Sequence, residues 1–253
     1  MMKRRFNRSS SRRLVALLGL VVALCLAAPA AASAVTVYAA ASLREALPEM
    51  APAQTYNFAG SNALQLQIER GAPADVFASA APEEAQALFQ EGLCSRPVTF
   101  ATNVVVMLVP KGNPGHLKSV YGLRQGGHTI AIGTPGVPIG GYTRELLARM
   151  RLSSILTNNT VTLEKDVAGI TSKVALGAVE AGFAYVTDGR IVAGRVEIIR
   201  LPRWAQPPVR YQACIVHRPG ADAAGAKKFM EALTGSRGRT ALKKGGFGLP
   251  PSA

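Results

Sequence analysis

The stretch VTLEKDVAGITSKVALGAVEAGFAYVTDG, residues 161–189, decides the fold class of this 253-residue chain. It begins with a short apolar run, continues with an amphipathic segment that opens at Asp166 and Val167, and ends with a second apolar run. This pattern predicts a strand, a helix and a second strand. Strands joined through a helix in this way lie parallel in one sheet, so the stretch indicates an α/β protein.

The same alternation extends over most of the chain on both sides of this stretch. Glycines and prolines punctuate the segments, as is typical of helix ends and turns. Because strands and helices alternate almost throughout, we expect mainly parallel sheets flanked by helices. Strands are expected at 36–41, 55–60, 74–79, 103–112, 129–135, 197–202 and 209–217, and helices at 61–71, 82–92, 140–150, 222–235 and 237–247, with a further helix beginning at Ser42.

Two of the expected strands, 103–112 and 209–217, suggest how the chain divides into lobes. They begin about 100 residues apart and enclose a self-contained α/β block. A chain that crosses from one lobe to another and later returns has this appearance. We therefore predict a first lobe of residues 35–102 plus 213–253 and a second lobe of residues 103–212, each boundary being placed to within several residues.

The first 34 residues have the three parts of a secretory signal peptide. Residues 1–13 are basic, residues 14–28 are apolar, and residues 29–34 are small. We expect cleavage near Ala34 and export to the periplasm. No later run of about 18 apolar residues predicts a membrane span.

Two variants of this export signal are less favoured. Arg12 and Arg13 could mark a twin-arginine route, but the chain has no cofactor motif that would require folded export. Cys25 could carry a lipid anchor, but the bulky Leu24 stands where a small residue is expected.

The charge of the exported chain is smaller than the formal +14 of the whole sequence. The first 34 residues hold six of the 29 Lys and Arg and none of the 15 Asp and Glu, so residues 35–253 carry +8. These charges are scattered and not interleaved with aromatic residues, which favours a solvated surface and excludes a nucleic-acid partner from our expectations. Cys94 and Cys214 either pair in the oxidising compartment or remain buried thiols, and the sequence leaves both open.

The motifs of common hydrolases and metal sites are absent from the sequence. There is no G-x-S-x-G, no H-E-x-x-H and no C-x-x-C, and the three histidines share no local motif with a nucleophile or a second ligand. We therefore expect a protein that is not an enzyme and that holds neither a cofactor nor a bare metal ion.

Four junctions that lead into expected helices are rich in small or hydroxyl residues. Ser42 opens a capping box with Glu45, Ser61 follows a glycine, residues 137–141 form a Pro/Gly turn, and Asp166 precedes the helix of the opening stretch. The first N–H groups of a helix lack partners, so each helix start is a potential anion site. Each junction alone is more often ordinary helix chemistry.

These junctions carry a specific resemblance. In order and spacing, VTVYAAASL (35–43), NFAGSNALQLQIERGAPADVFASA (57–80), GTPGVPIGGYTRELL (133–147), EKDV (164–167) and AGFAYVTD (181–188) resemble the periplasmic molybdate-binding proteins of ABC transporters. The resemblance covers nearly all of residues 35–250. It implies the two-lobed fold of type II periplasmic binding proteins, with the ligand in the cleft between the lobes.

The resemblance also implies a set of ligand-binding residues. Molybdate or tungstate would be held by neutral hydrogen-bond donors: hydroxyl and backbone N–H from each of two serines, backbone N–H from two further residues, and one phenol. By position these residues are Ser42, Ser61, Ile139, Val167 and Tyr185. A monomer that docks on a membrane permease is expected.

Three alternatives remain at this point. They are a receptor for another tetrahedral oxyanion such as sulfate, an exported α/β enzyme that uses the anion site for a phosphorylated substrate, and a structural or adhesion module. One local departure matters for the site: Pro48 falls where the first helix would continue, so that helix is expected to be short or kinked.

Overall fold

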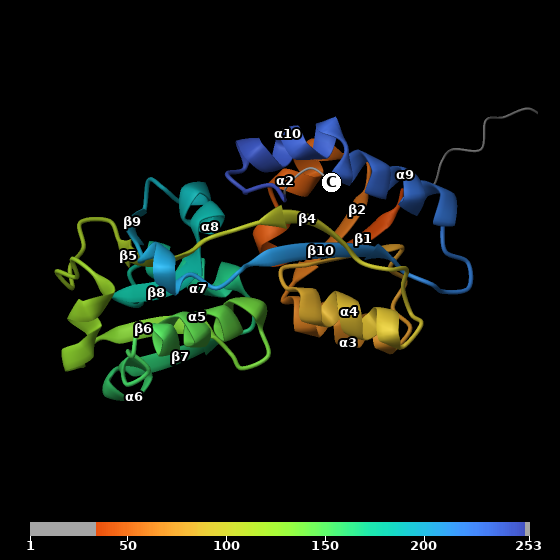
Figure 1. Cartoon of the computed structure of the whole chain (residues 1–253). Helices are drawn as coiled ribbons and strands as arrows, with labels where there is room; N and C mark the ends of the chain where they lie inside the picture. Colours follow the sequence, from red (N-terminus) through yellow and green to blue (C-terminus); the bar gives the residue numbers. More distant parts are fainter. Residues whose placement is uncertain (1–33, 251–253) are drawn as a thin grey trace, which may run out of the picture. The chain divides into compact units, whose positions relative to one another are not determined.

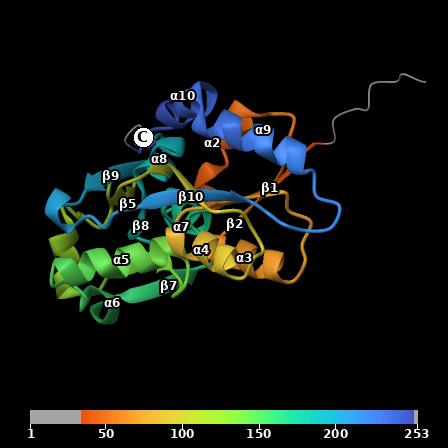
Figure 2. The same cartoon turned by 45° about the vertical axis from the view of Figure 1, so that its right-hand side comes forward.

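The computed structural model describes residues 34–250, and the expected signal peptide, residues 1–34, lies outside the described residues except for Ala34. The described chain forms two five-stranded sheets (Figures 1 and 2). The first sheet has the order β2-β1-β3-β10-β4. Its strands are β1 (Thr36–Ala40), β2 (Thr55–Ala59), β3 (Val76–Ser79), β4 (Val98–Thr102) and β10 (Arg210–Ile215).

The second sheet repeats this arrangement with different segments of the chain. Its order is β7-β6-β8-β5-β9. In each sheet the first three strands of the order pair in parallel, and the fourth pairs antiparallel with both neighbours. The sheets are therefore mixed, with one strand reversed against four. The strands are β5 (Val105–Pro110), β6 (Thr129–Gly133), β7 (Thr160–Glu164), β8 (Ala181–Tyr185) and β9 (Val196–Arg200).

The chain passes between the sheets at two places. It leaves the first sheet after β4, crosses through Asn103 and Val104, and enters the second sheet at β5. It returns between the end of β9 at Arg200 and the start of β10 at Arg210. In both sheets the reversed strand is the one that the chain enters on crossing. We call each sheet with the helices packed on it a lobe.

Side chains of the first sheet alternate between two apolar layers, as the pleat of a strand requires. On β1, Tyr38 belongs to the layer under α3 (Ser61–Glu69) and α4 (Pro82–Gln90), whereas Val37 and Ala39 face the other layer. Figure 1 shows α3 and α4 on one side of this sheet and other helices on the opposite side. Those helices are α2 (Ala46–Met50), α9 (Ala223–Thr234) and α10 (Ser236–Lys244).

The second sheet is covered by helices that follow its parallel strands. The chain also contains three short 3-10 segments, η1, η2 and η3, of which η1 directly follows β1. The bounds are α5 (Pro138–Arg149), α6 (Ile155–Asn158), α7 (Val167–Ala175), α8 (Val186–Ile191), η1 (Ala41–Leu43), η2 (Val120–Gln125) and η3 (Arg203–Ala205).

The structure differs from the sequence-based expectations in several elements. Strand β4 and helices α6 and α8 were not predicted, and β5 begins at Val105 instead of residue 103. In the sequence β4 runs into the apolar stretch of β5, so the change of sheet between them has no local signal. The helix expected to begin at Ser42 is split: η1 ends at Leu43 and α2 starts at Ala46, with Pro48 in its first turn, where proline is tolerated.

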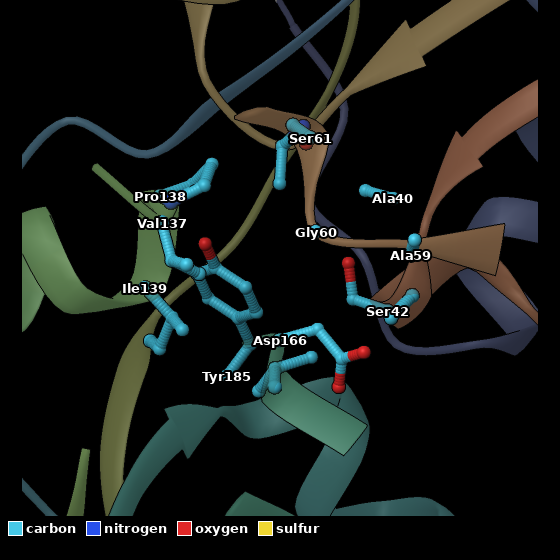
Figure 3. A pocket seen from close by; sticks show the side chains of 13 residues that line it. Ala40, Ser42, Ala59, Gly60, Ser61, Val137, Pro138, Ile139, Asp166 and Tyr185 are labelled. Carbon is cyan, nitrogen blue, oxygen red and sulfur yellow. The ribbon is translucent and has the colours of Figure 1, made fainter. Parts of the chain in front are cut away.

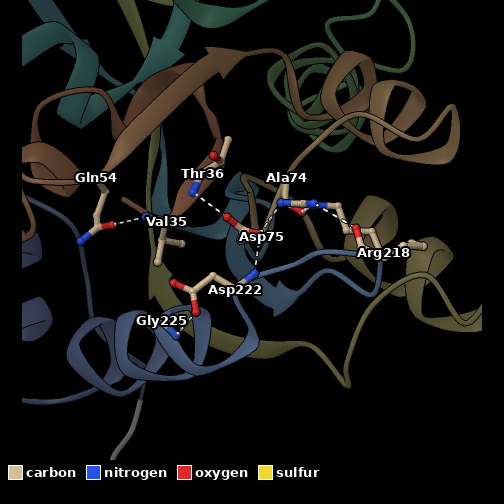
Figure 4. Close-up of polar contacts among 9 residues, drawn as sticks. Val35, Thr36, Gln54, Ala74, Asp75, Arg218, Asp222 and Gly225 are labelled. Carbon is tan, nitrogen blue, oxygen red and sulfur yellow. Dashed lines mark hydrogen bonds and ion pairs between the residues drawn. The ribbon is translucent and has the colours of Figure 1, made fainter. Parts of the chain in front are cut away.

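Two interactions join segments of the first lobe that lie far apart in the sequence. Cys94 and Cys214 form a disulfide, with their Cα atoms 5.9 Å apart, which decides the alternative left open above. The carboxylate of Asp75, buried before β3, accepts hydrogen bonds from the Thr36 N–H at 2.9 Å, the Asp222 N–H at 3.2 Å and the Arg218 guanidinium at 2.6 Å (Figure 4). It thereby joins the start of β1 to the segment that leads into α9.

Among residues 34–250, no helix has the length and apolarity needed to cross a membrane.

Candidate functional site

Residues from both lobes line one pocket (Figure 3). It contains about 220 Å³ of atom-free space, including the part open to solvent. All five residues singled out from the sequence line it, and Figure 3 shows Ser42, Ser61 and Tyr185 around the same space. The lining residues are Ala40, Ala41, Ser42, Ala59, Gly60, Ser61, Ala80, Val137, Pro138, Ile139, Asp166, Val167 and Tyr185.

The end of β1 supplies the alanines and Ser42. Ala40 and Ala41 bring a backbone without bulky side chains to the pocket wall. The predicted capping box is wrong: Ser42 lies inside η1, and no side chain caps either η1 or α2. Instead, the buried Ser42 Oγ lies 2.9 Å from the phenol oxygen of Tyr211, so a tertiary contact replaces the local one.

Ser61 is the first residue of α3, and Gly60 is its N-cap, as the sequence indicated. The Ala80 N–H, just after β3, donates to Ser61 Oγ at 3.0 Å. A hydroxyl that accepts one hydrogen bond keeps its own proton for another partner. The Ser61 O–H is therefore available to donate toward the pocket, together with the N–H groups of the first turn of α3.

A close approach of the two lobes explains the glycine at position 60. Its backbone angles, φ −63° and ψ 136°, suit any residue. A Cβ atom there would lie 2.4 Å from the backbone carbonyl oxygen of Lys165, which follows β7 in the other lobe. Gly60 is thus required by the contact between lobes and not by its own conformation.

Helix α5 brings Ile139 to the pocket. It starts at Pro138, whose missing N–H costs nothing at a first helical position. Gly133 at the end of β6 and Gly140 in the first turn of α5 touch so closely that a Cβ on Gly133 would lie 2.7 Å from the Gly140 nitrogen. This packing directs the start of α5, with the backbone of Ile139, at the pocket.

Asp166 and Val167 begin α7 as the sequence predicted. Asp166 is the N-cap, and its Oδ1 accepts the Gly169 N–H at 2.9 Å. Val167 is the first helical residue, and its N–H has no partner within the helix. The capping carboxylate therefore satisfies a donor deeper in the first turn and leaves the outermost one for the pocket.

Tyr185 ends β8 and is 1% exposed. Its hydroxyl has no hydrogen-bond partner within the described part of the chain. Burial raises the pKa of this phenol well above its ordinary value, and the neighbouring Tyr211 and Tyr142 add to the shift. The group is therefore neutral and keeps its proton. Because buried polar groups are normally hydrogen-bonded, this phenol is available to donate to a ligand.

The pocket has a distinct electrostatic character. Asp166 is the one charged residue among those that line it, and its carboxylate is engaged in capping. No lining residue is Lys, Arg or His. Within residues 34–250, no group of three or more His, Cys, Asp or Glu could hold a metal ion. The pocket thus offers neutral donors, which suit an anion.

The structure adds three residues behind the pocket that the sequence did not indicate. Tyr211 contacts Ser42, and Asn103 contacts both Tyr211 and Thr187 of the other lobe. Each of these three side chains is buried. Asn103 and Tyr211 lie in no local motif, and Thr187 lies in AGFAYVTD without being singled out there. The three residues come from separate parts of the chain, so only the folded arrangement reveals their contact.

Asp188 in α8 is a fourth buried polar residue near the pocket. Its side chain is fully buried, and within the described residues neither carboxylate oxygen forms a hydrogen bond of ordinary geometry. Burial raises the pKa of this carboxyl to about 7, although Arg44 and the backbone N–H groups of Asp188 and Tyr185 act in the opposite direction.

Comparisons with known proteins agree with this geometry. A family model of bacterial extracellular solute-binding proteins matches residues 35–248. The molybdate-binding protein ModA of Mycobacterium tuberculosis is 33% identical over 229 residues, covering 87% of this chain and 86% of the relative. ModA of Escherichia coli is 28% identical over 233 residues, covering 84% and 88%.

A solved structure also matches. The periplasmic molybdate-binding protein of Azotobacter vinelandii is 24% identical, with a TM-score of 0.74, and the match covers 85% of this chain and 99% of that one. At this identity the match bears on the fold alone. It confirms the predicted two-lobed type II arrangement.

The raised pKa of Asp188 predicts a pH-dependent stability. In the unfolded chain the carboxyl ionises near its ordinary pKa of 3.8, whereas in the folded chain it keeps its proton up to about pH 7. Between these values the unfolded state loses a proton that the folded state retains, so this group lowers the free energy of unfolding as pH rises. The penalty is absent below about pH 4 and complete above about pH 7.

Replacing Asp188 by Asn removes this penalty. We expect the Asp188→Asn variant to melt at least about 4 °C above the wild type at pH 8, since 1 kcal/mol corresponds to about 2–4 °C in a domain of this size. The difference should shrink toward pH 4. Thermal melts at both pH values measure it, with Glu91→Gln at an exposed position as the control for loss of a negative charge. A difference that is the same at both pH values would contradict the prediction.

Proposed function

This chain belongs to the bacterial extracellular solute-binding proteins, and on that premise we propose that it captures molybdate, and with it tungstate, for the membrane permease of an ABC importer. The proposed ligand-binding residues are Ser42, Ser61, Ile139, Val167 and Tyr185, which offer hydroxyl or backbone N–H donors. Relatives named as molybdate-binding match over most of their length and support this ligand class.

One observation carries the proposal: neutral donors from both lobes converge on a pocket that has no cationic side chain. Three hydroxyls and the starts of α3, α5 and α7 surround it. Hydrogen bonds to a charged group contribute about 1.5–3 kcal/mol each. Several of them, offset by dehydration of the anion and ordering of the lobes, support an affinity in the nanomolar to micromolar range.

Neutral donors also account for release of the bound anion and for selection against phosphate and sulfate. A buried pair between the dianion and Lys or Arg would suffer the desolvation of two charges, whereas fixed dipoles avoid a countercharge. A protonated oxyanion brings a hydrogen that needs an acceptor, so hydrogen phosphate is disfavoured. Sulfate is disfavoured because its smaller radius leaves some donors without a partner.

The proposed cycle uses motion of the two lobes, predicted as residues 35–102 with 213–253 and residues 103–212, each boundary being placed to within several residues. Strand β10 (Arg210–Ile215) belongs wholly to the first sheet. The two crossings between the sheets act as the hinge, as in other hinge-closure proteins. The closed form delivers the anion to the permease. We propose a monomer without catalytic activity or cofactor. As an extracellular solute-binding protein the chain is exported, and cleavage near Ala34 with a periplasmic location is part of the proposal.

Calorimetric titration of residues 35–253 tests the ligand class. We expect one-to-one binding of molybdate and of tungstate at neutral pH and no measurable heat from sulfate or phosphate, because only the larger deprotonated anions meet all donors. Sulfate affinity equal to that of molybdate would favour the alternative oxyanion receptor. Silence from all four anions would exclude the proposed function.

The unpartnered phenol of Tyr185 gives a clean test of the site. The Tyr185→Phe variant should bind molybdate about tenfold to a hundredfold more weakly, the effect of losing one hydrogen bond to a charged group. The melting temperature of the empty protein should stay the same or rise, since the lost hydroxyl has no partner among the described residues. Titration and thermal melts measure the two effects.

Two further variants sharpen this test. Tyr142→Phe removes another buried phenol of the same lobe that does not line the pocket, and it should leave the affinity unchanged. Ser61→Ala should weaken binding and also lower the melting temperature, because the Ala80 N–H loses its acceptor. Unchanged affinity in Tyr185→Phe would remove the phenol from the proposed ligand set.

The close approach at Gly60 predicts a variant that blocks closure. In Gly60→Ala the new methyl group would meet the Lys165 carbonyl only when the lobes are together. We expect molybdate affinity to fall at least about tenfold, a change of about 1.4 kcal/mol, while the melting temperature of the empty protein stays the same.

Gly194→Ala is the matched control, because a Cβ at that position meets nothing within 4 Å. Titration of both variants with molybdate measures whether only Gly60→Ala loses affinity. Wild-type affinity in Gly60→Ala would mean that the bound state does not bring Gly60 and Lys165 into this contact.

A further inference from the structure

We propose that Tyr211 and Asn103 are positioning residues that fix the direction of the Ser42 hydroxyl, so that it presents its hydrogen to the bound anion. The inference rests on the proposed function, since it concerns how one proposed ligand-binding residue is held. It assigns a selectivity role to two side chains that do not line the pocket.

The three side chains form a buried chain of polar atoms that ends at the pocket. Ser42 Oγ lies 2.9 Å from the phenol oxygen of Tyr211, and Asn103 Nδ2 donates to the same phenol oxygen at 3.2 Å. Tyr211 is 0% exposed and Ser42 is 2% exposed. Water therefore has little access to these atoms, and their protons must be shared among protein groups and the ligand.

The orientation of the Asn103 amide is set by its other partners. The Val104 N–H donates to Asn103 Oδ1 at 2.9 Å, which identifies that atom as the oxygen. Asn103 Nδ2 also donates to Thr187 Oγ1 at 2.9 Å. The group that faces Tyr211 is consequently an amide NH₂, which can only donate.

Counting protons along the chain then gives one favourable direction. The phenol oxygen of Tyr211 accepts from Asn103, and its own proton is free to point at Ser42 Oγ. Burial raises the pKa of Tyr211, so the phenol keeps this proton. Ser42 Oγ becomes an acceptor at its back, and its remaining hydrogen points to the pocket.

Donation in the opposite direction, from Ser42 to Tyr211, would leave the phenol proton of Tyr211 without an acceptor. If Ser42 gave its hydrogen to Tyr211, the phenol would receive two hydrogens, and its own proton would have no acceptor among the partners that the described residues supply. A buried donor without a partner costs about 1–3 kcal/mol. The arrangement therefore favours Ser42 as a donor to the ligand.

The hydroxyl of Ser61, the other serine of the pocket, is also held by a hydrogen bond from the protein, but its partner is a backbone group. Ser61 Oγ is held by the peptide N–H of Ala80, which is also donor-only. The Ser42 relay instead runs through Asn103, between β4 and β5, and reaches Thr187 in the second lobe. In both serines the protein occupies one acceptor position of the hydroxyl oxygen, which favours donation of the hydroxyl hydrogen to the ligand over acceptance of a hydrogen from a protonated oxyanion.

The test is a double-mutant cycle. Tyr211→Phe keeps the ring, which packs edge-on against Phe247 and Tyr185, and removes the phenol oxygen. We expect molybdate affinity to fall about tenfold and the ratio of molybdate to phosphate affinity to fall as well, because the loosened Ser42 hydroxyl can then accept a hydrogen. In a Ser42→Ala background the same change should alter molybdate affinity by less than about twofold.

Two more variants test whether the effect belongs to the hydrogen bonds of Tyr211 and Asn103. Tyr56→Phe is the matched control: its half-buried phenol donates to the backbone of Leu47 and Ala51, away from the pocket, so molybdate affinity should stay unchanged. Asn103→Asp replaces the donor that faces Tyr211 by an acceptor and should also lower the molybdate-to-phosphate ratio. Repeating it in the Ser42→Ala background cancels the direct effect of the added charge.

The outcomes separate the two proposals. An equal loss of affinity in the presence and absence of the Ser42 hydroxyl, or an unchanged anion ratio in Tyr211→Phe, would overturn the relay while wild-type molybdate binding stands. Failure of the wild type to bind molybdate would instead overturn the proposed function itself.

Discussion

The site depends on one constraint: the starts of several helices must meet at one point from two separate sheets. In open α/β sheets this happens beyond the carboxyl ends of the parallel strands. Here β1 and β2 lead into η1 and α3, and β6 and β7 lead into α5 and α7. Each lobe therefore contributes about half of the donors, and a pocket with neutral donors on all sides exists only between the two lobes.

The polar atoms behind the pocket determine what the pocket offers. The Ala80 N–H donates to Ser61 Oγ, and the phenol of Tyr211 bonds Ser42 Oγ, so each serine is held from the protein side. The Asp166 carboxylate accepts the Gly169 N–H. These contacts leave hydrogens pointing inward, while Asp166 is the one charged residue among the lining residues. A wall of donors without a countercharge suits a dianion that must be held firmly and still released.

The sequence predicted the elements that have strong local signals. The strand–helix–strand pattern at 161–189 indicated a parallel sheet, and glycine, proline and aspartate marked the starts of α3, α5 and α7. All five candidate residues that the resemblance singled out line one pocket. Prediction failed for β4, where the chain changes sheets within two residues, and for the capping box at Ser42, which a tertiary contact replaces.

By itself, then, the sequence determined the fold class, the order of most strands and helices, and which junctions are smooth enough to approach a ligand. These features follow from periodicity and turn chemistry, which act over a few residues. Only the tertiary structure decided that one strand in each sheet is reversed, that Gly60 touches the chain at Lys165, and that Asn103, Tyr211 and Ser42 form one hydrogen-bonded chain. Those facts depend on contacts between residues more than 70 positions apart, for which local sequence carries no signal.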